Sequence, residues 1–104
     1  MASSFSGREN RRIKAAMLIT DNYSNGDWFT VHDIMDLWAE RWIKCLTEKE
    51  LSKTIPIFTV ERPGCSILEY EFRKGHNYKY YRLVVRFDDE GNPLPLYQKR
   101  DRDI

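Results

Sequence analysis

Residues 30–54 read TVHDIMDLWAERWIKCLTEKELSKT and predict two helices joined by a very short turn. Thr30 stands three residues before Asp33, and Thr47 stands three residues before Glu50. At this spacing the threonine hydroxyl accepts a hydrogen bond from the later N–H, and the carboxylate accepts one from the N–H of the threonine. Both helices are therefore expected to begin with a capping box.

The apolar residues of the first of these helices follow the spacing of one helix face: Val31, Ile34, Met35, Trp38 and Trp42. The second helix has Leu51 and Ile55 on its apolar side, and Pro56 limits its length because the residue before a proline prefers extended geometry. A turn at residues 44–46 and a polar outer side on the second helix predict a helix-turn-helix. An ordinary helical hairpin that recognises nothing has the same pattern, so both interpretations stay open.

A further helix is expected upstream, from Arg8 to about Tyr23, with one apolar face formed by Ile13, Ala16, Met17 and Thr20 and widened by Leu18 and Ile19. Its first turns carry four cations, Arg8, Arg11, Arg12 and Lys14. Cations at this end oppose the helix dipole, so a surface that faces a partner is one interpretation; a solvated amphipathic face explains the same composition and is the simpler one. After the turn at residues 24–27, residues 28–29 predict a short strand that must pair with a later one.

Residues 67–72 and 78–87 alternate between apolar or aromatic and polar side chains and predict a β-hairpin, with residues 73–77 as its loop. Between Phe72 and Phe87 the chain has five cations and no acid: Arg73, Lys74, Lys79, Arg82 and Arg86. This is the most polarised stretch of the sequence. It indicates either attraction to phosphates or a sheet edge protected by charge from pairing with other chains.

The order of helix, short strand, two helices and hairpin resembles the winged helix-turn-helix superfamily over residues 8–87. The resemblance rests on residues 28–34 (WFTVHDI), similar to the short strand and capped second helix, and on residues 46–53 (LTEKELSK), similar to the start of the recognition helix. Residues 79–83 (KYYRL) are similar to the last strand of the wing. Residues 55–66, with their two prolines, are longer than the usual link into the wing.

The resemblance implies a small α+β winged helix with three helices, a short strand and a two-stranded wing. It also implies a transcriptional regulator that contacts duplex DNA through its third helix and wing loop. The candidate contacts are Thr47, Lys49, Ser52, Lys53 and Thr54 in the third helix, and Arg73, Lys74, His76, Asn77 and Lys79 in the wing. Many assemblies use the same fold to bind proteins, so a protein-interaction module or a homodimer is the alternative.

Length and composition set the remaining expectations. A chain of 104 residues is expected to form one domain, at residues 8–87. Residues 1–7 are expected to be structureless, and residues 88–104 to form a polar, flexible tail. Within this tail, residues 94–97 are able to dock on the domain or on a second copy. With 17 Lys and Arg against 16 Asp and Glu, the net charge is close to zero and does not by itself indicate a nucleic-acid-binding protein. The acidic side of the helix predicted after Thr30 favours the protein-interaction alternative.

The sequence has no motif for catalysis, a cofactor or a metal. Cys45, Cys65, His32 and His76 lack the paired spacing of a zinc site, and neither histidine has a neighbouring nucleophile. No apolar run is long enough to span a membrane, and no signal peptide is recognisable. We therefore expect a non-enzymatic protein without cofactors, in the cytoplasm or, in a eukaryote, the nucleus.

Overall fold

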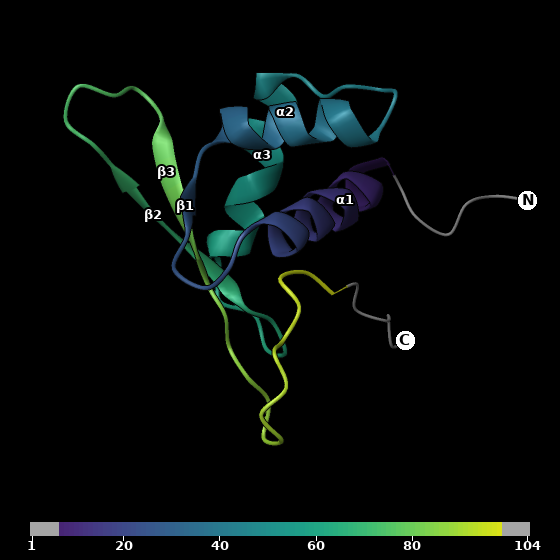
Figure 1. Cartoon of the computed structure of the whole chain (residues 1–104), viewed down its shortest axis with the longest axis vertical. Coiled ribbons are helices and arrows are strands. Elements are labelled where there is room, and N and C mark those ends of the chain that lie inside the picture. Colours follow the sequence, from purple (N-terminus) through teal and green to yellow (C-terminus); the bar gives the residue numbers. More distant parts are fainter. Residues whose placement is uncertain (1–6, 99–104) are drawn as a thin grey trace, which may run out of the picture.

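The computed structural model describes residues 7–98, and Figure 1 shows its helices gathered on one side of a small antiparallel sheet. Residues 1–6, most of the predicted structureless segment, lie outside the described part. The elements are, in chain order, α1 (Gly7–Asn22), β1 (Trp28–Phe29), α2 (Val31–Arg41), α3 (Glu48–Thr54), the 3-10 helix η1 (Ile55–Thr59), β2 (Ile67–Phe72) and β3 (Lys79–Val84). The fold is mixed α+β, as predicted.

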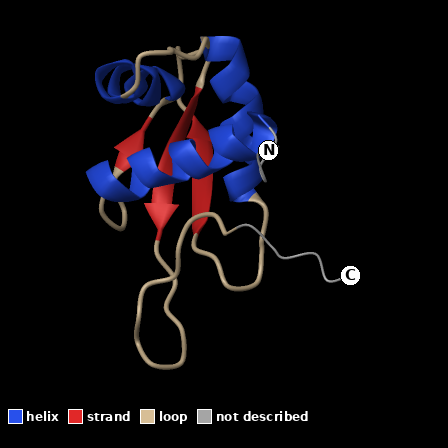
Figure 2. Ribbon diagram, turned by 90° about the vertical axis from the view of Figure 1, so that its right-hand side faces the viewer, coloured by secondary structure: helices blue, strands red, loops and turns tan. Residues whose placement is uncertain are grey.

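The strands form one antiparallel sheet in the order β1-β3-β2, and Figure 2 shows α1 crossing in front of it. Phe29 pairs with Tyr81, which pairs with Tyr70 on its other side. The sequence predicts a short strand and a two-stranded hairpin, and the sheet joins them as three strands, because two residues of strand need a neighbour to satisfy their backbone groups.

Both predicted capping boxes are present. The Thr30 hydroxyl accepts a hydrogen bond from the Asp33 N–H, and the Asp33 carboxylate accepts one from the Thr30 N–H. Thr47 and Glu50 repeat this arrangement at the start of α3. The α-helical part of α3 ends at Thr54, before Pro56, and the chain continues as η1.

The core lies between the helices and the sheet. Its central side chains are Ala15, Leu18 and Ile19 from α1, Ile34 and Trp38 from α2, Leu51 from α3, Ile55 and Phe58 from η1, and Phe29, Leu68, Tyr81 and Leu83 from the sheet. The predicted inner face of α1 is partly wrong, because Met17 is 40% exposed and Thr20 is exposed. Leu18 and Ile19, which were expected to widen that face, are buried in the core together with Ala16.

The chain after β3 returns to the body of the molecule. The Ser66 hydroxyl donates a hydrogen bond to the Leu94 carbonyl (2.8 Å), and the Ser66 N–H donates one to the Pro95 carbonyl (2.8 Å). Leu96 is buried, and the Tyr97 hydroxyl donates to the Glu9 carboxylate (2.5 Å). The packed part of the chain therefore extends to Tyr97, past the boundary at residue 87 that the sequence predicts.

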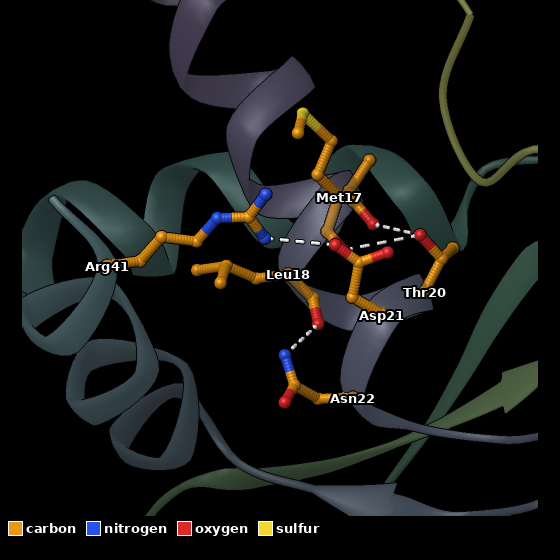
Figure 3. Close-up of polar contacts among 7 residues, drawn as sticks. Met17, Leu18, Thr20, Asp21, Asn22 and Arg41 are labelled. Atoms are coloured by element: carbon orange, nitrogen blue, oxygen red, sulfur yellow. Dashed lines mark hydrogen bonds and ion pairs between the residues drawn. The ribbon is translucent and has the colours of Figure 1, made fainter.

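Polar contacts also fix the far end of α1. Figure 3 shows Arg41 of α2 reaching Asp21 of α1, with 2.9 Å between the guanidinium nitrogen and the carboxylate oxygen. The Asn22 side-chain amide donates to the Leu18 carbonyl (2.8 Å), which satisfies one of the last carbonyls of the helix. Among residues 7–98, no helix has both the length and the apolar character needed to cross a bilayer.

Candidate nucleic-acid interface

The outer side of α3 is open and polar. Leu51 is fully buried and anchors the helix to the core, whereas Lys49, Ser52 and Lys53 are exposed. None of these three side chains has a hydrogen-bond or ion-pair partner among the described residues. They are the predicted contacts of the third helix that the structure leaves available to a ligand.

The two threonines predicted as contacts have their hydroxyls engaged within α3. The Thr47 hydroxyl accepts from the Glu50 N–H (3.1 Å) and donates to the Glu50 carboxylate (3.2 Å). Thr54 is 7% exposed, and its hydroxyl donates to the Glu50 carbonyl (2.9 Å). We therefore drop Thr54 from the candidate contacts and assign Thr47 to the helix cap.

A basic concavity separates the first turns of α1 from α3. It has a volume of about 440 Å³ and is lined by Arg8, Arg11, Arg12, Glu50, Lys53 and Thr54; we call it the α1–α3 concavity. None of its four cations forms an ion pair with a described carboxylate. The basic first turns of α1 thus lie beside the helix that the resemblance assigns to DNA recognition.

Glu50 is the acid that lines this concavity, and its charge is already engaged. The backbone N–H of Thr47 donates to its carboxylate (3.0 Å) and is the largest cause of a lowered Glu50 pKa. The Thr47 hydroxyl and the nearby charges of Arg11 and Lys44 act in the same direction. Glu50 therefore stays ionised and bound to the cap while the surrounding cations face solvent.

In the hairpin, by contrast, the arginines are paired. Arg73 lies 2.8 Å from Glu71, and Arg82 forms an ion pair with Glu69 on the neighbouring strand. The Arg86 guanidinium donates two hydrogen bonds to Glu61, of 2.7 and 3.1 Å. The acids lie outside residues 72–87, so the polarised stretch seen in the sequence is largely compensated in space.

Aromatic rings hold the hairpin cations in place. The Arg73 guanidinium lies 3.8 Å from the centroid of the Tyr80 ring and 5.1 Å from that of Trp28. Lys79 Nζ lies 4.5 Å from the ring centroid of Tyr70. Such contacts stabilise a cation by about 0.5–1 kcal/mol at exposed sites. They orient these side chains along the sheet, away from the loop.

The loop of the hairpin remains accessible. Lys74 and Asn77 are exposed, and Lys74 has no ion pair with a described residue. His76 is also exposed, and its Nδ1 shares a hydrogen bond of 2.6 Å with the Tyr80 hydroxyl. Of the predicted wing contacts, Lys74 and Asn77 are therefore the least constrained.

His32 links the hairpin to α3, which the sequence analysis did not identify. Its ring lies 5.3 Å from that of Tyr78 in an edge-to-face arrangement, and its Nε2 lies 3.4 Å from the Glu48 carboxylate. The hairpin, the start of α2 and the start of α3 thus form one continuous surface. His32, Tyr78 and Glu48 lie far apart in the chain, so no local pattern marks this contact.

Comparisons with protein-family models, with curated proteins and with solved structures find no match to this chain.

Proposed function

We propose that the chain is a winged-helix protein that binds duplex DNA and regulates transcription. The observation that carries the proposal is the α1–α3 concavity, where Arg8, Arg11 and Arg12 flank the open polar side of α3. Phosphate contacts supply most of the sequence-independent affinity of DNA-binding proteins. By itself α3 is nearly neutral, because its two lysines, Lys49 and Lys53, are offset by two acids, Glu48 and Glu50. The α1 cations provide the attraction that α3 lacks.

The order of the elements supports the same assignment. The winged-helix order is followed by α1, β1, α2, α3, β2 and β3, and β1 joins the hairpin by pairing with β3. In this arrangement a groove-binding α3 presents Lys49, Ser52 and Lys53 to base edges, and the hairpin loop presents Lys74 and Asn77 to the flanking backbone.

The length of α3 limits what it reads. Its seven residues are about 10 Å long at 1.5 Å per residue, which equals about three base pairs at 3.4 Å each. One copy therefore has few base contacts, and phosphate contacts contribute most of its affinity. Binding is expected to be strongly salt-dependent and only modestly sequence-specific.

The test is the affinity for a fluorescent DNA duplex, measured by anisotropy at increasing salt. The wild type is expected to bind with a negative slope of log K against log salt. The triple variant R8A/R11A/R12A is expected to flatten that slope by about 2 to 3, close to one per lost phosphate contact.

A matched pair of single variants locates the effect. Arg12→Ala removes a cation from the α1–α3 concavity, whereas Arg86→Ala removes one that is paired with Glu61. Only the first is expected to change the slope, by about 1. The proposal fails if the wild type does not bind duplex DNA at low salt, or if both variants weaken binding equally.

A further inference from the structure

A second hollow adjoins the first two turns of α1 on the side of the loop between α2 and α3. It has a volume of about 530 Å³, and its lining includes Arg11, Lys14, Trp42, Ile43 and Lys44. We call it the Trp42 hollow. Ile43 is fully exposed, and Lys14 Nζ lies 5.1 Å from the centroid of the Trp42 ring. The hollow therefore combines exposed apolar surface with surrounding positive charge.

The charge of the Trp42 hollow is not balanced from within. Arg11, Lys14 and Lys44 form no ion pair with a described residue, whereas Arg41 at the edge is paired with Asp21. Glu50 is the acid in its lining, and the capping box holds that carboxylate. The surface is thus suited to a ligand with several carboxylates and an apolar side chain.

The chain carries such a segment at the opposite end of the molecule. Residues 87–92 (FDDEGN) form a turn that Figure 1 shows projecting below the sheet, away from the helices, and Figure 2 shows the same placement. Phe87 is 60% exposed, and Asp88, Asp89 and Glu90 follow it directly. We call this segment the acidic turn.

Internal hydrogen bonds give the acidic turn a fixed shape. The Asp88 N–H donates to the Asn92 carbonyl (2.9 Å), and the Asp88 carboxylate accepts from the N–H groups of Glu90 and Asn92, both at 2.9 Å. Asp88 is used inside the turn, and neither Asp89 nor Glu90 has an ion pair with a described residue. A turn shaped in advance loses little conformational entropy on docking.

We propose that the acidic turn of one copy docks in the Trp42 hollow of a second copy. Asp89 and Glu90 face Lys14 and Lys44, and Phe87 covers Ile43. The two surfaces have opposite charges, and each has an apolar side chain that is exposed in the single chain. Because they lie at opposite ends, the contact is head to tail and joins different copies into chains or closed rings.

The contact is small and charged, so it is expected to be weak and salt-sensitive. It does not depend on the proposed DNA binding, and it is tested without DNA. Sedimentation velocity of the full chain at increasing protein concentration is expected to show reversible self-association at low salt that is lost at high salt.

Charge reversal provides the decisive experiment. The variants K14E/K44E and D89K/E90K are each expected to be monomeric alone, since their hollow and turn then carry the same sign. An equimolar mixture is expected to associate again, because each variant offers the surface that the other lacks. The control D36K/E40K changes the total charge as D89K/E90K does, but on the exposed side of α2, and is expected to self-associate like the wild type.

Lys14 also stacks on Trp42, so K14E/K44E can weaken the fold as well as the contact. A second variant, which keeps Lys14, separates the two effects. K44E leaves that stack intact and is expected to weaken self-association about two- to fivefold. The proposal is overturned if the wild type is monomeric at every concentration, if association survives both charge reversals, if K44E has no effect, or if the folded variants do not associate when mixed.

Discussion

The hairpin and the α1–α3 concavity are both rich in cations, but they differ in how these cations are paired. The hairpin has five cations and no acid between Phe72 and Phe87, yet Arg73, Arg82 and Arg86 each contact a carboxylate from outside that stretch. In the α1–α3 concavity, Arg8, Arg11 and Arg12 face solvent beside Lys53, and the one acid in its lining belongs to a helix cap. The count of charges along a segment therefore does not measure the charge of the surface it forms.

This difference changes which surface dominates the proposed DNA binding. The resemblance to winged helices gives α3 and the wing the leading roles, whereas the structure favours α1 and α3, with the hairpin loop as a weaker contact. A paired hairpin arginine has to exchange its carboxylate for a phosphate before it contacts DNA, so it adds less to binding than an unpaired cation does.

The largest expected effect is the loss of the packing beneath the α2–α3 loop. Trp38 is 3% exposed, and its indole N–H donates to the Lys44 carbonyl (3.0 Å). Trp38→Ala is expected to lower the free energy of unfolding by about 3–5 kcal/mol, measured by urea denaturation. Trp28→Ala removes the same side chain from the outer face of the sheet and should cost clearly less. Equal losses would contradict the burial assigned to Trp38.

The next effect comes from releasing the hairpin cations. E69Q/E71Q removes the partners of Arg82 and Arg73, so the salt dependence of DNA binding is expected to steepen by about 1 to 2. The stability should change by less than about 1 kcal/mol, because both pairs are exposed. D36N/E40Q neutralises two acids on α2 and is the matched control. A similar steepening in the control would attribute the effect to total charge alone.

The cap of α3 has a smaller effect. Thr47→Ala removes the hydroxyl that accepts from the Glu50 N–H and is expected to cost about 1 kcal/mol. The melting temperature should then fall by about 4–8 °C in a domain of this size. Ser52→Ala, on the exposed side of the same helix, serves as the comparison and should leave it nearly unchanged. An unchanged melting temperature in Thr47→Ala would place the start of α3 elsewhere.

The smallest effect is a pH dependence at the same cap. The Glu50 pKa is lowered in the folded chain, chiefly by the Thr47 N–H, so the ionised form stabilises the fold. That contribution is complete above the ordinary glutamate pKa of about 4.3 and is lost as the pH falls through the lowered value. Urea midpoints of the wild type and E50Q should therefore differ at neutral pH and converge once the pH has fallen below the lowered Glu50 pKa. A constant difference would mean that the Glu50 charge does not act through folding.

Local patterns in the sequence determined a large part of the secondary structure. Thr30 and Thr47 begin helices because a capping box needs only residues three positions apart. The alternation in residues 67–72 and 78–87 predicted the hairpin, whose second strand is shorter than expected, at Lys79–Val84. Pro56 predicted a limit to α3 but not its exact end: the α-helix ends at Thr54, and Ile55 keeps helical backbone angles rather than the extended geometry expected before a proline, because the chain continues as η1. Trp38 was identified as a core residue from its place in the apolar stripe.

Only the tertiary structure decided which charges are compensated and which surfaces are continuous. Glu61 reaches Arg86, Glu69 reaches Arg82, and the first turns of α1 lie beside α3, all through packing of segments far apart in the chain. The same packing buries Leu96 and Thr54, which the sequence assigned to the tail and to the recognition surface. Capping and alternation act over a few residues and leave a local signal, whereas ion pairing and burial depend on distances that exist only once the core has formed.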